Sequence, residues 1–125
     1  MINNISFEEF RLKVLDIQNE KIKVLSNKPV LLTFYADRWG PCRMFEQVLD
    51  EVVPKYKDKI NFYKVESEKE PVLSAFFKVM GIPNTATIST DGEINSHPGM
   101  IPKETLKYYL DGLILKSTKG NNDNN

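Results

Sequence analysis

The sequence predicts a single domain of the α/β class. Apolar runs of strand length alternate along the chain with segments in which apolar residues recur at helical spacing, and this alternation is typical of a sheet covered by helices. The chain has 125 residues, which are enough to bury one core and too few for two ordinary domains. We place the domain at residues 1–118 and expect the polar segment 119–125 to be a disordered tail.

The first half of the chain predicts a helix, a buried strand and a second helix. Ser6 followed by Glu9 is a capping-box pattern, so a first helix should begin near residue 6 and extend to the residues before Pro29. Residues 30–36, VLLTFYA, form an apolar run typical of a central strand with both faces covered. Pro41 suits the first turn of the second helix. The expected apolar stripe of that helix comprises Met44, Phe45, Val48, Leu49 and Val52.

The second half predicts a strand, a short helix, a hairpin and a final helix. Residues 60–65 form the strand and residues 70–79 the short helix. Asp91-Gly92 is a hairpin-turn signal between two short polar strands, and Pro102 opens the final helix. The final helix should bury Leu106, Tyr109, Leu110, Leu113 and Ile114. The aromatic pairs expected in the core are Phe76 with Phe77 and Tyr108 with Tyr109.

The composition argues against several classes of function. Lys and Arg number 17 and so do Asp and Glu, so we expect neither nucleic-acid nor membrane partners. The segment MINNISFEEF lacks the pattern of a signal peptide and no run is long enough to span a membrane, so we expect a cytoplasmic protein. With one cysteine, Cys42, and one histidine, His97, we expect no internal disulfide, no metal site and no cofactor.

Three short motifs carry a family resemblance. WGPCRMF, residues 39–45, follows the first apolar strand, GIP, residues 81–83, precedes the hairpin, and Gly99 precedes the final helix. In this order and spacing they resemble the thioredoxin family over residues 29–115. The resemblance implies a thioredoxin-like fold, a central mixed β-sheet flanked by helices, with a cis peptide bond before Pro83.

The active-site motif departs from the pattern of that family. In the family, a Trp-Cys-Gly-Pro-Cys loop stands at a helix start, where the first cysteine attacks a disulfide and the second resolves the mixed disulfide. Gly40, Pro41 and Cys42 match, so the resemblance gives Cys42 the resolving position and leaves the attacking cysteine missing. In an ungapped alignment Trp39 takes the place of the attacking cysteine. In a second alignment Trp39 is the family's Trp, Arg38 is inserted and the cysteine is deleted; both alignments remain open.

A second departure concerns the proton acceptor of the resolving thiol. The family usually carries a buried Asp in the strand before the motif, and this sequence has Thr33 there. A hydroxyl cannot replace a carboxylate base at neutral pH. The nearby basic residue of the family is kept as Lys64. Because both the nucleophile and the acid are replaced, we interpret the sequence as a natural loss of dithiol chemistry.

Two functions remain open from the sequence. The first is a binding module that holds extended segments of client or partner proteins by strand addition at Ile82, with no redox turnover. Its groove would comprise Trp39, Gly40, Pro41, Ile82, Pro83 and Gly99. The second is a thiol-disulfide oxidoreductase of cell redox homeostasis, in which Cys42 is catalytic and an external thiol resolves its mixed disulfide. An exposed Trp39 would be a binding anchor, whereas a buried one would only pack within the domain. An accessible Cys42 would be a reactive thiol, whereas a shielded one would be inert.

Overall fold

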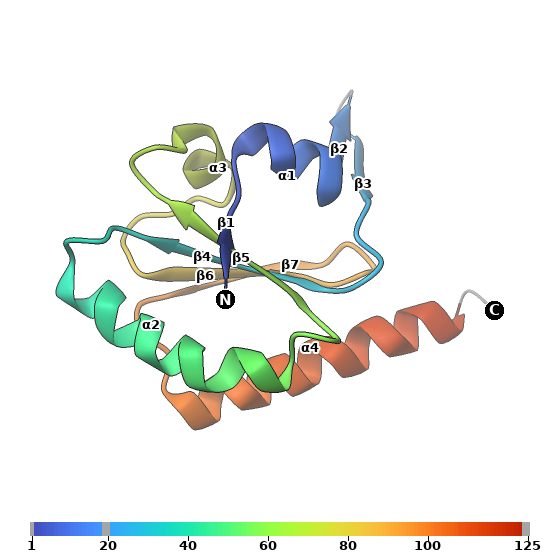
Figure 1. The fold of residues 1–125 in the computed structure, drawn as a ribbon. Coiled ribbons are helices and arrows are strands. Elements are labelled where there is room, and N and C mark those ends of the chain that lie inside the picture. Colours follow the sequence, from blue (N-terminus) through green and yellow to red (C-terminus); the bar gives the residue numbers. More distant parts are fainter. Residues whose placement is uncertain (1, 19–20, 124–125) are drawn as a thin grey trace.

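A five-stranded sheet forms the centre of the molecule (Figure 1) in the computed structural model, which describes residues 2–18 and 21–123. Its strands are β1 (Asn3–Asn4), β4 (Val30–Tyr35), β5 (Asn61–Glu66), β6 (Asn84–Ile88) and β7 (Ile94–Pro98). Their order across the sheet is β1-β5-β4-β6-β7. β5 runs parallel to both β1 and β4, whereas β6 is antiparallel to β4 and β7. The expected mixed sheet is therefore confirmed.

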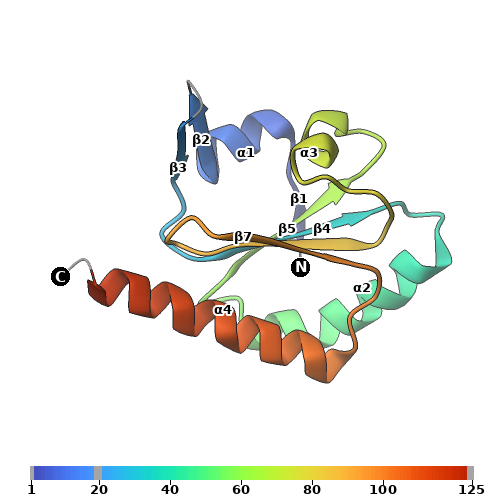
Figure 2. The ribbon, with the colours of Figure 1, turned by 180° about the vertical axis from the view of Figure 1, so that it is seen from behind.

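Helices cover both faces of this sheet. They are α1 (Phe7–Lys13), α2 (Gly40–Val52), α3 (Pro71–Phe76) and α4 (Lys103–Asp123), and a 3-10 turn at Val53–Lys55 continues α2. In both ribbon views α1 and α3 lie on one face, and α2 and α4 lie on the other (Figures 1 and 2). The flanking helices expected from the resemblance are present.

Strand β4 divides the core into two halves because its side chains alternate between the faces. Leu32 and Phe34 belong to the cluster under α1 and α3, which also contains Phe77. Leu31 belongs to the cluster under α2 and α4, together with Phe45. The three strand residues Leu31, Leu32 and Phe34 are fully buried, as predicted for a strand with both faces covered.

The prediction of one long first helix is wrong. α1 covers only seven residues and is followed by an antiparallel pair, β2 (Leu15–Gln18) and β3 (Lys21–Val24). Ile17 lies opposite Ile22 in this pair. β-branched side chains fit strands better than helices, and packing of Ile17 against the first core half outweighs its helical spacing from Phe10. Residues 19–20, between the two strands, lie outside the described residues.

The predicted capping box at the start of α1 is confirmed. The backbone N–H of Glu9 donates to Ser6 Oγ at 3.2 Å, and the backbone N–H of Ser6 donates to Glu9 Oε1 at 3.2 Å. These hydrogen bonds, that from the Ser6 backbone first, lower the pKa of the Glu9 carboxyl. The box fixes the helix start beside the short strand β1, which the sequence pattern does not predict.

The two aromatic pairs differ in their burial. Phe77 is buried and Phe76 packs beside it with ring centroids 5.0 Å apart, as predicted. Tyr108 is exposed, and Tyr109 stacks on His97 with centroids 4.5 Å apart at the solvent boundary. Tyr109 thus faces the sheet as predicted, but with 37% of it exposed it does not belong to the buried core expected for the pair.

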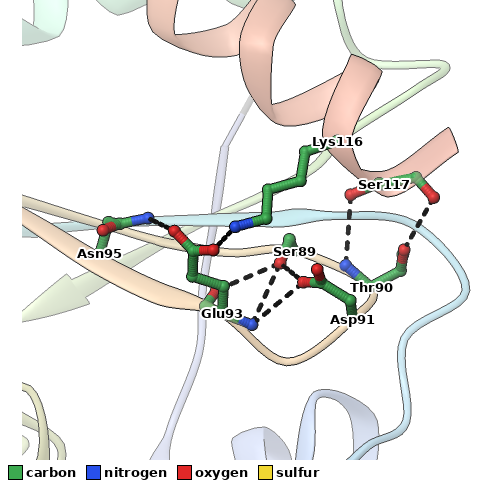
Figure 3. A network of polar contacts seen from close by, with 7 residues as sticks. All are labelled: Ser89, Thr90, Asp91, Glu93, Asn95, Lys116 and Ser117. Atoms are coloured by element: carbon green, nitrogen blue, oxygen red, sulfur yellow. Dashed lines mark hydrogen bonds and ion pairs between the residues drawn. The ribbon is translucent and has the colours of Figure 1, made fainter. Parts of the chain in front are cut away.

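The far end of α4 is tied to the β6–β7 turn (Figure 3). The backbone N–H of Thr90 donates to Ser117 Oγ at 3.2 Å, and Thr90 Oγ1 donates to the Ser117 carbonyl at 3.2 Å. Lys116 and Glu93 form an ion pair beside these bonds. In both ribbon views this end of α4 lies on the opposite side of the molecule from the start of α2 (Figure 2).

The helix continues past the predicted domain boundary at residue 118. α4 is helical to Asp123, so residues 119–123 differ from the disordered tail expected there. Once a helix is fixed by its packed turns, each further residue adds a hydrogen bond at little nucleation cost. Residues 124–125 lie outside the described residues. No helix within the described part of the chain is long and apolar enough to cross a membrane.

Candidate functional site

The loop after β4 turns Trp39 outward and Cys42 inward. Trp39 is the N-cap residue of α2, its side chain makes no capping hydrogen bond, and 51% of it is exposed. Its carbonyl accepts hydrogen bonds from the backbone N–H groups of Cys42 at 3.1 Å and Arg43 at 3.2 Å, which closes the first helical turn. Pro41 stands in that turn, where its missing N–H costs nothing. Gly40 is exposed and Pro41 is half-buried.

The predicted apolar stripe of α2 needs one correction. Phe45, Leu49 and Val52 are buried, but the buried residue of the first turn is Cys42 and not Met44. Met44 lies two residues, and hence about 200° around the helix, from Cys42 and is 58% exposed. Cys42 therefore belongs to the inward face of the helix, and Met44 belongs to the surface.

Cys42 lines a small cavity between α2 and the sheet. The sulfur-bearing side chain is only 6% exposed. The cavity has a volume of about 90 Å³, and Pro83 lines it opposite α2. The remaining lining residues are Ile2, Thr33, Tyr35, Phe45, Glu46, Leu49, Asp50 and Lys64. The structure thus brings the lone thiol and Pro83 to one cavity.

The polar wall of this cavity comes from β4 and β5. Thr33 is 5% exposed and lies opposite Lys64 on the neighbouring strand. Lys64 Nζ lies 5.3 Å from the centroid of the Tyr35 ring, a cation–π distance. The Tyr35 hydroxyl donates to Asn4 Oδ1 at 2.8 Å, and burial raises the pKa of this phenol. No carboxylate of these two strands lines the cavity; Glu46 and Asp50 of α2 do.

Pro83 lies where the loop before β6 meets the loop before α4. The Ile82–Pro83 peptide bond is cis. The backbone N–H of Gly99 donates to the Pro83 carbonyl at 2.8 Å. Gly99 has a φ of +80°, which favours glycine because a Cβ is strained there. Gly99 is exposed, Pro83 is buried, and the half-buried Ile82 side chain packs against the first half of the core.

The segment before Pro83 has backbone N–H and C=O groups that make no backbone–backbone hydrogen bond in the described chain. Within residues 2–18 and 21–123, Met80, Gly81 and Ile82 take part in no backbone–backbone hydrogen bond, and they belong to no helix or strand. Met80 and Gly81 are exposed and Ile82 is half-buried. Backbone groups at such a surface are donors and acceptors for water or for another extended chain.

Two arginines around the Trp39 loop make contacts with other parts of the chain. Arg38 forms an ion pair with Glu68, which follows β5. Arg43 Nε donates to the Asp37 carbonyl at 3.0 Å. Both arginines therefore have partners within the chain, and the exposed indole of Trp39 lies between them in sequence.

The predicted site residues gather at one end of the sheet without lining one cavity. Cys42 and Pro83 share the cavity, and Gly99 contacts Pro83 through its backbone. Trp39 and Ile82 lie on the surface around them. The sequence reasoning missed the three exposed methionines of this end, Met44, Met80 and Met100. Met80 and Met100 stand next to the motif glycines Gly81 and Gly99, which was the available signal, whereas helical spacing places Met44 in the expected buried stripe of α2.

Comparison with known proteins agrees with this geometry. The family model described as Thioredoxin matches residues 11–112. Thioredoxin of Borreliella burgdorferi is 30% identical over 108 residues, which cover 86% of this chain and 92% of that protein. Thioredoxin of Griffithsia pacifica is 32% identical over 106 residues, which cover 85% of this chain and 96% of that protein.

A solved structure supports the fold independently of sequence. Chloroplastic thioredoxin z superposes with a TM-score of 0.72 at 18% identity, covering 90% of this chain and 93% of that one. With the mixed sheet, the Gly-Pro-Cys helix start and the cis-proline in place, the matched family accounts for nearly the whole described chain. The chain belongs to the thioredoxin family.

Proposed function

We propose that this protein is a binding module of the thioredoxin family, which holds extended segments of partner proteins beside Pro83 and does not run a dithiol cycle. The observation that carries the proposal is the segment 80–82, in which Met80 and Gly81 are exposed and no backbone group has a backbone partner in the described chain. An extended segment that pairs with Ile82 would satisfy these groups as an added strand does.

The sulfur content of the chain argues against the dithiol cycle. A dithiol enzyme forms a disulfide between its own two cysteines when it reduces a substrate. This chain has one cysteine, so oxidation of Cys42 cannot close an internal disulfide. The binding surface does not depend on that sulfur, because segment 80–82 and Trp39 lie outside the cavity that Cys42 lines.

Trp39 is the expected anchor of the complex. It is 51% exposed, and tryptophan is enriched among residues that contribute strongly to binding energy. Covering its indole with an apolar side chain of the partner would contribute ~2 kcal/mol, in line with central anchors elsewhere. The backbone of Ile82 would set the direction of the segment, and Trp39 would supply contact area.

A single-thiol oxidoreductase is the second candidate. One observation favours it: Cys42 lines the same cavity as Pro83, where a client segment would lie. The 6% exposure of Cys42 weighs against it, because a mixed disulfide requires in-line approach of a second sulfur.

The test uses Trp39 as its own reporter, because it is the only tryptophan of the chain. A panel of uncharged, cysteine-free peptides of about ten residues, the length of an extended docking segment, is titrated against the protein while Trp39 fluorescence is followed. We expect saturable binding of at least one peptide. N-methylation of one central residue of that peptide should weaken binding about tenfold or more, since it removes an N–H from the pairing.

Matched variants locate the binding surface. By calorimetry, Trp39→Ala should lose most of the affinity, whereas Leu115→Ala removes a similarly exposed apolar side chain from α4 and should lose none. The proposal fails if no peptide in the panel binds, or if N-methylation at every position leaves the affinity unchanged.

A further inference from the structure

All described methionines lie on the surface near the proposed binding site. The chain has four methionines, of which Met1 lies outside the described residues. Met44 is 58% exposed, Met80 is 96% exposed and Met100 is 39% exposed. Methionine is among the residue types most often buried, so its exposure at all three described positions is uncommon for this residue type.

Each of the three lies within or next to a motif of the site. Met44 lies in the first turns of α2, two residues after Cys42. Met80 immediately precedes the Gly81-Ile82-Pro83 segment, and Met100 immediately follows Gly99. In both ribbon views the start of α2, the loop before β6 and the loop before α4 lie at the same end of the molecule (Figures 1 and 2). We call these three residues the methionine rim.

The chemistry of the rim defines the partner it suits. A thioether side chain is apolar, unbranched and flexible, so it fits apolar surfaces of differing shape. Near Trp39, Arg38 pairs with Glu68, and Arg43 donates a hydrogen bond to the Asp37 carbonyl. Covering a charged group with apolar thioethers would cost its hydration, so the rim suits an uncharged, apolar segment.

We propose that the methionine rim binds uncharged apolar segments and that its oxidation by peroxide weakens this binding. The inference rests on the proposed function and deepens it. In the reaction, the O–O bond of hydrogen peroxide breaks, one oxygen bonds to the thioether sulfur and the other leaves as water. The sulfur loses two electrons, the peroxide gains them, and the product is a polar sulfoxide.

Burial separates the two kinds of sulfur in this chain. Cys42 is 6% exposed on the buried face of α2, whereas the rim methionines are 39% to 96% exposed. A small oxidant therefore reaches the thioethers without opening the core. A sulfoxide that is covered by an apolar segment loses hydrogen bonds to water, so the complex should weaken while the fold is kept.

The experiment begins with limited peroxide treatment and mapping of the added oxygens by peptide mass spectrometry. We expect Met44, Met80 and Met100 to gain one oxygen each before Cys42 is modified. Binding of the tightest uncharged peptide from the Trp39 titration is then measured by calorimetry before and after treatment. We expect oxidation to weaken it about tenfold or more. Methionine sulfoxide reductases should restore the affinity, whereas dithiothreitol, which reverses thiol oxidation, should not.

Two variants distinguish the effect of oxidising the three rim methionines from the effect of oxidation elsewhere in the protein. The triple variant Met44→Leu, Met80→Leu and Met100→Leu keeps apolar side chains that peroxide does not oxidise. Whatever its starting affinity, it should change less than about twofold on treatment. The triple variant to Gln places polar side chains of similar length there and should bind weakly without peroxide. Circular dichroism should show both variants and the oxidised protein folded.

The possible failures are distinguishable. Absence of binding before any peroxide overturns the proposed function, and this inference with it. Binding that survives oxidation of all three methionines overturns the inference and leaves the proposed function standing. Equal loss of affinity in the wild type and the leucine variant, or modification of Cys42 first, likewise overturns the inference.

Discussion

Thr33 and Lys64 lie opposite each other on neighbouring parallel strands and line the same cavity as Cys42. At the Thr33 position the family resemblance leads one to expect a carboxylate, and the strand supplies a hydroxyl instead. The carboxylates that line this cavity come from α2, where Glu46 stands four residues after Cys42 on the same side of the helix. The cavity thus has charged residues of both signs, Lys64 on β5 and Glu46 and Asp50 on α2, but it lacks the carboxylate expected on β4.

We expect no turnover of protein disulfides. With one cysteine the protein cannot complete the two-sulfur cycle, so its rate of insulin disulfide reduction should equal that of the dithiol reagent alone. A thioredoxin from a relative serves as the positive control. Acceleration well above the reagent rate, lost in Cys42→Ser, would support the single-thiol enzyme instead.

Restoring the second sulfur should restore a disulfide and little activity. Trp39→Cys places a thiol three residues before Cys42, across the intact Gly40-Pro41 turn, and the two sulfurs should form a disulfide on oxidation. Insulin reduction by this variant should stay at least about tenfold below that of a related thioredoxin, because Thr33 is no base. Adding Thr33→Asp should raise the rate.

The α2 carboxylate provides the control for that experiment. If Glu46 accepts the proton of Cys42, Trp39→Cys alone should be fully active, and Glu46→Gln in that background should remove the activity. This result would refute the argument that activity is low because Thr33 replaces the base. A low rate that Glu46→Gln leaves unchanged agrees with it.

Cys42 should react slowly with bulky reagents. Only 6% of the residue is exposed, and it stands in the first turn of α2 on the buried face of the helix. A bulky aromatic disulfide should react at least about a hundredfold more slowly with the native protein than with the protein in denaturant, since access requires local opening. Equal rates in the two states would mean an accessible sulfur, and would make the single-thiol enzyme the better assignment.

The stability of the fold should fall slightly in mild acid through His97. Burial against Tyr109 and the sheet lowers the pKa of this imidazole below its ordinary value of 6.5. A folded-state pKa below the unfolded one favours folding above pH 6.5, and this contribution is lost as pH falls through the folded-state pKa.

The measurement is denaturant unfolding across that pH range. The decrease in unfolding free energy should be small, because the ring is only partly buried, and His97→Gln should remove the part that is due to this residue. A variant with the same pH dependence as the wild type would show that His97 does not contribute.

Strand β4 and the start of α2 follow directly from the sequence. A continuous apolar run favours burial on both faces, and Pro41, which is excluded from a helix interior, favours a helix start where it precedes the apolar stripe of α2. The order of the Gly-Pro-Cys, Gly-Ile-Pro and Gly99 motifs likewise indicates the family. These signals are local, so they can be interpreted without knowing which segments meet.

The first thirty residues show where local pattern is insufficient. Phe10 and Ile17 have helical spacing, yet Phe10 lies on α1 and Ile17 on β2, and both pack on one core half. The chain changes from helix to strand between them because strand pairing with Ile22 and burial against the sheet together outweigh a weak helical preference.

The sequence by itself determined the family, the missing attacking cysteine and the replacement of the buried acid by Thr33. Only the tertiary structure decided that Cys42 shares a cavity with Pro83 and Glu46, and that Met80 is exposed beside an unpaired backbone. The physical reason is that residue type and spacing encode local preference. Which residues of different elements come into contact depends on strand register and on which face of each helix packs against the sheet. Both are set by the apolar surface buried over the whole core.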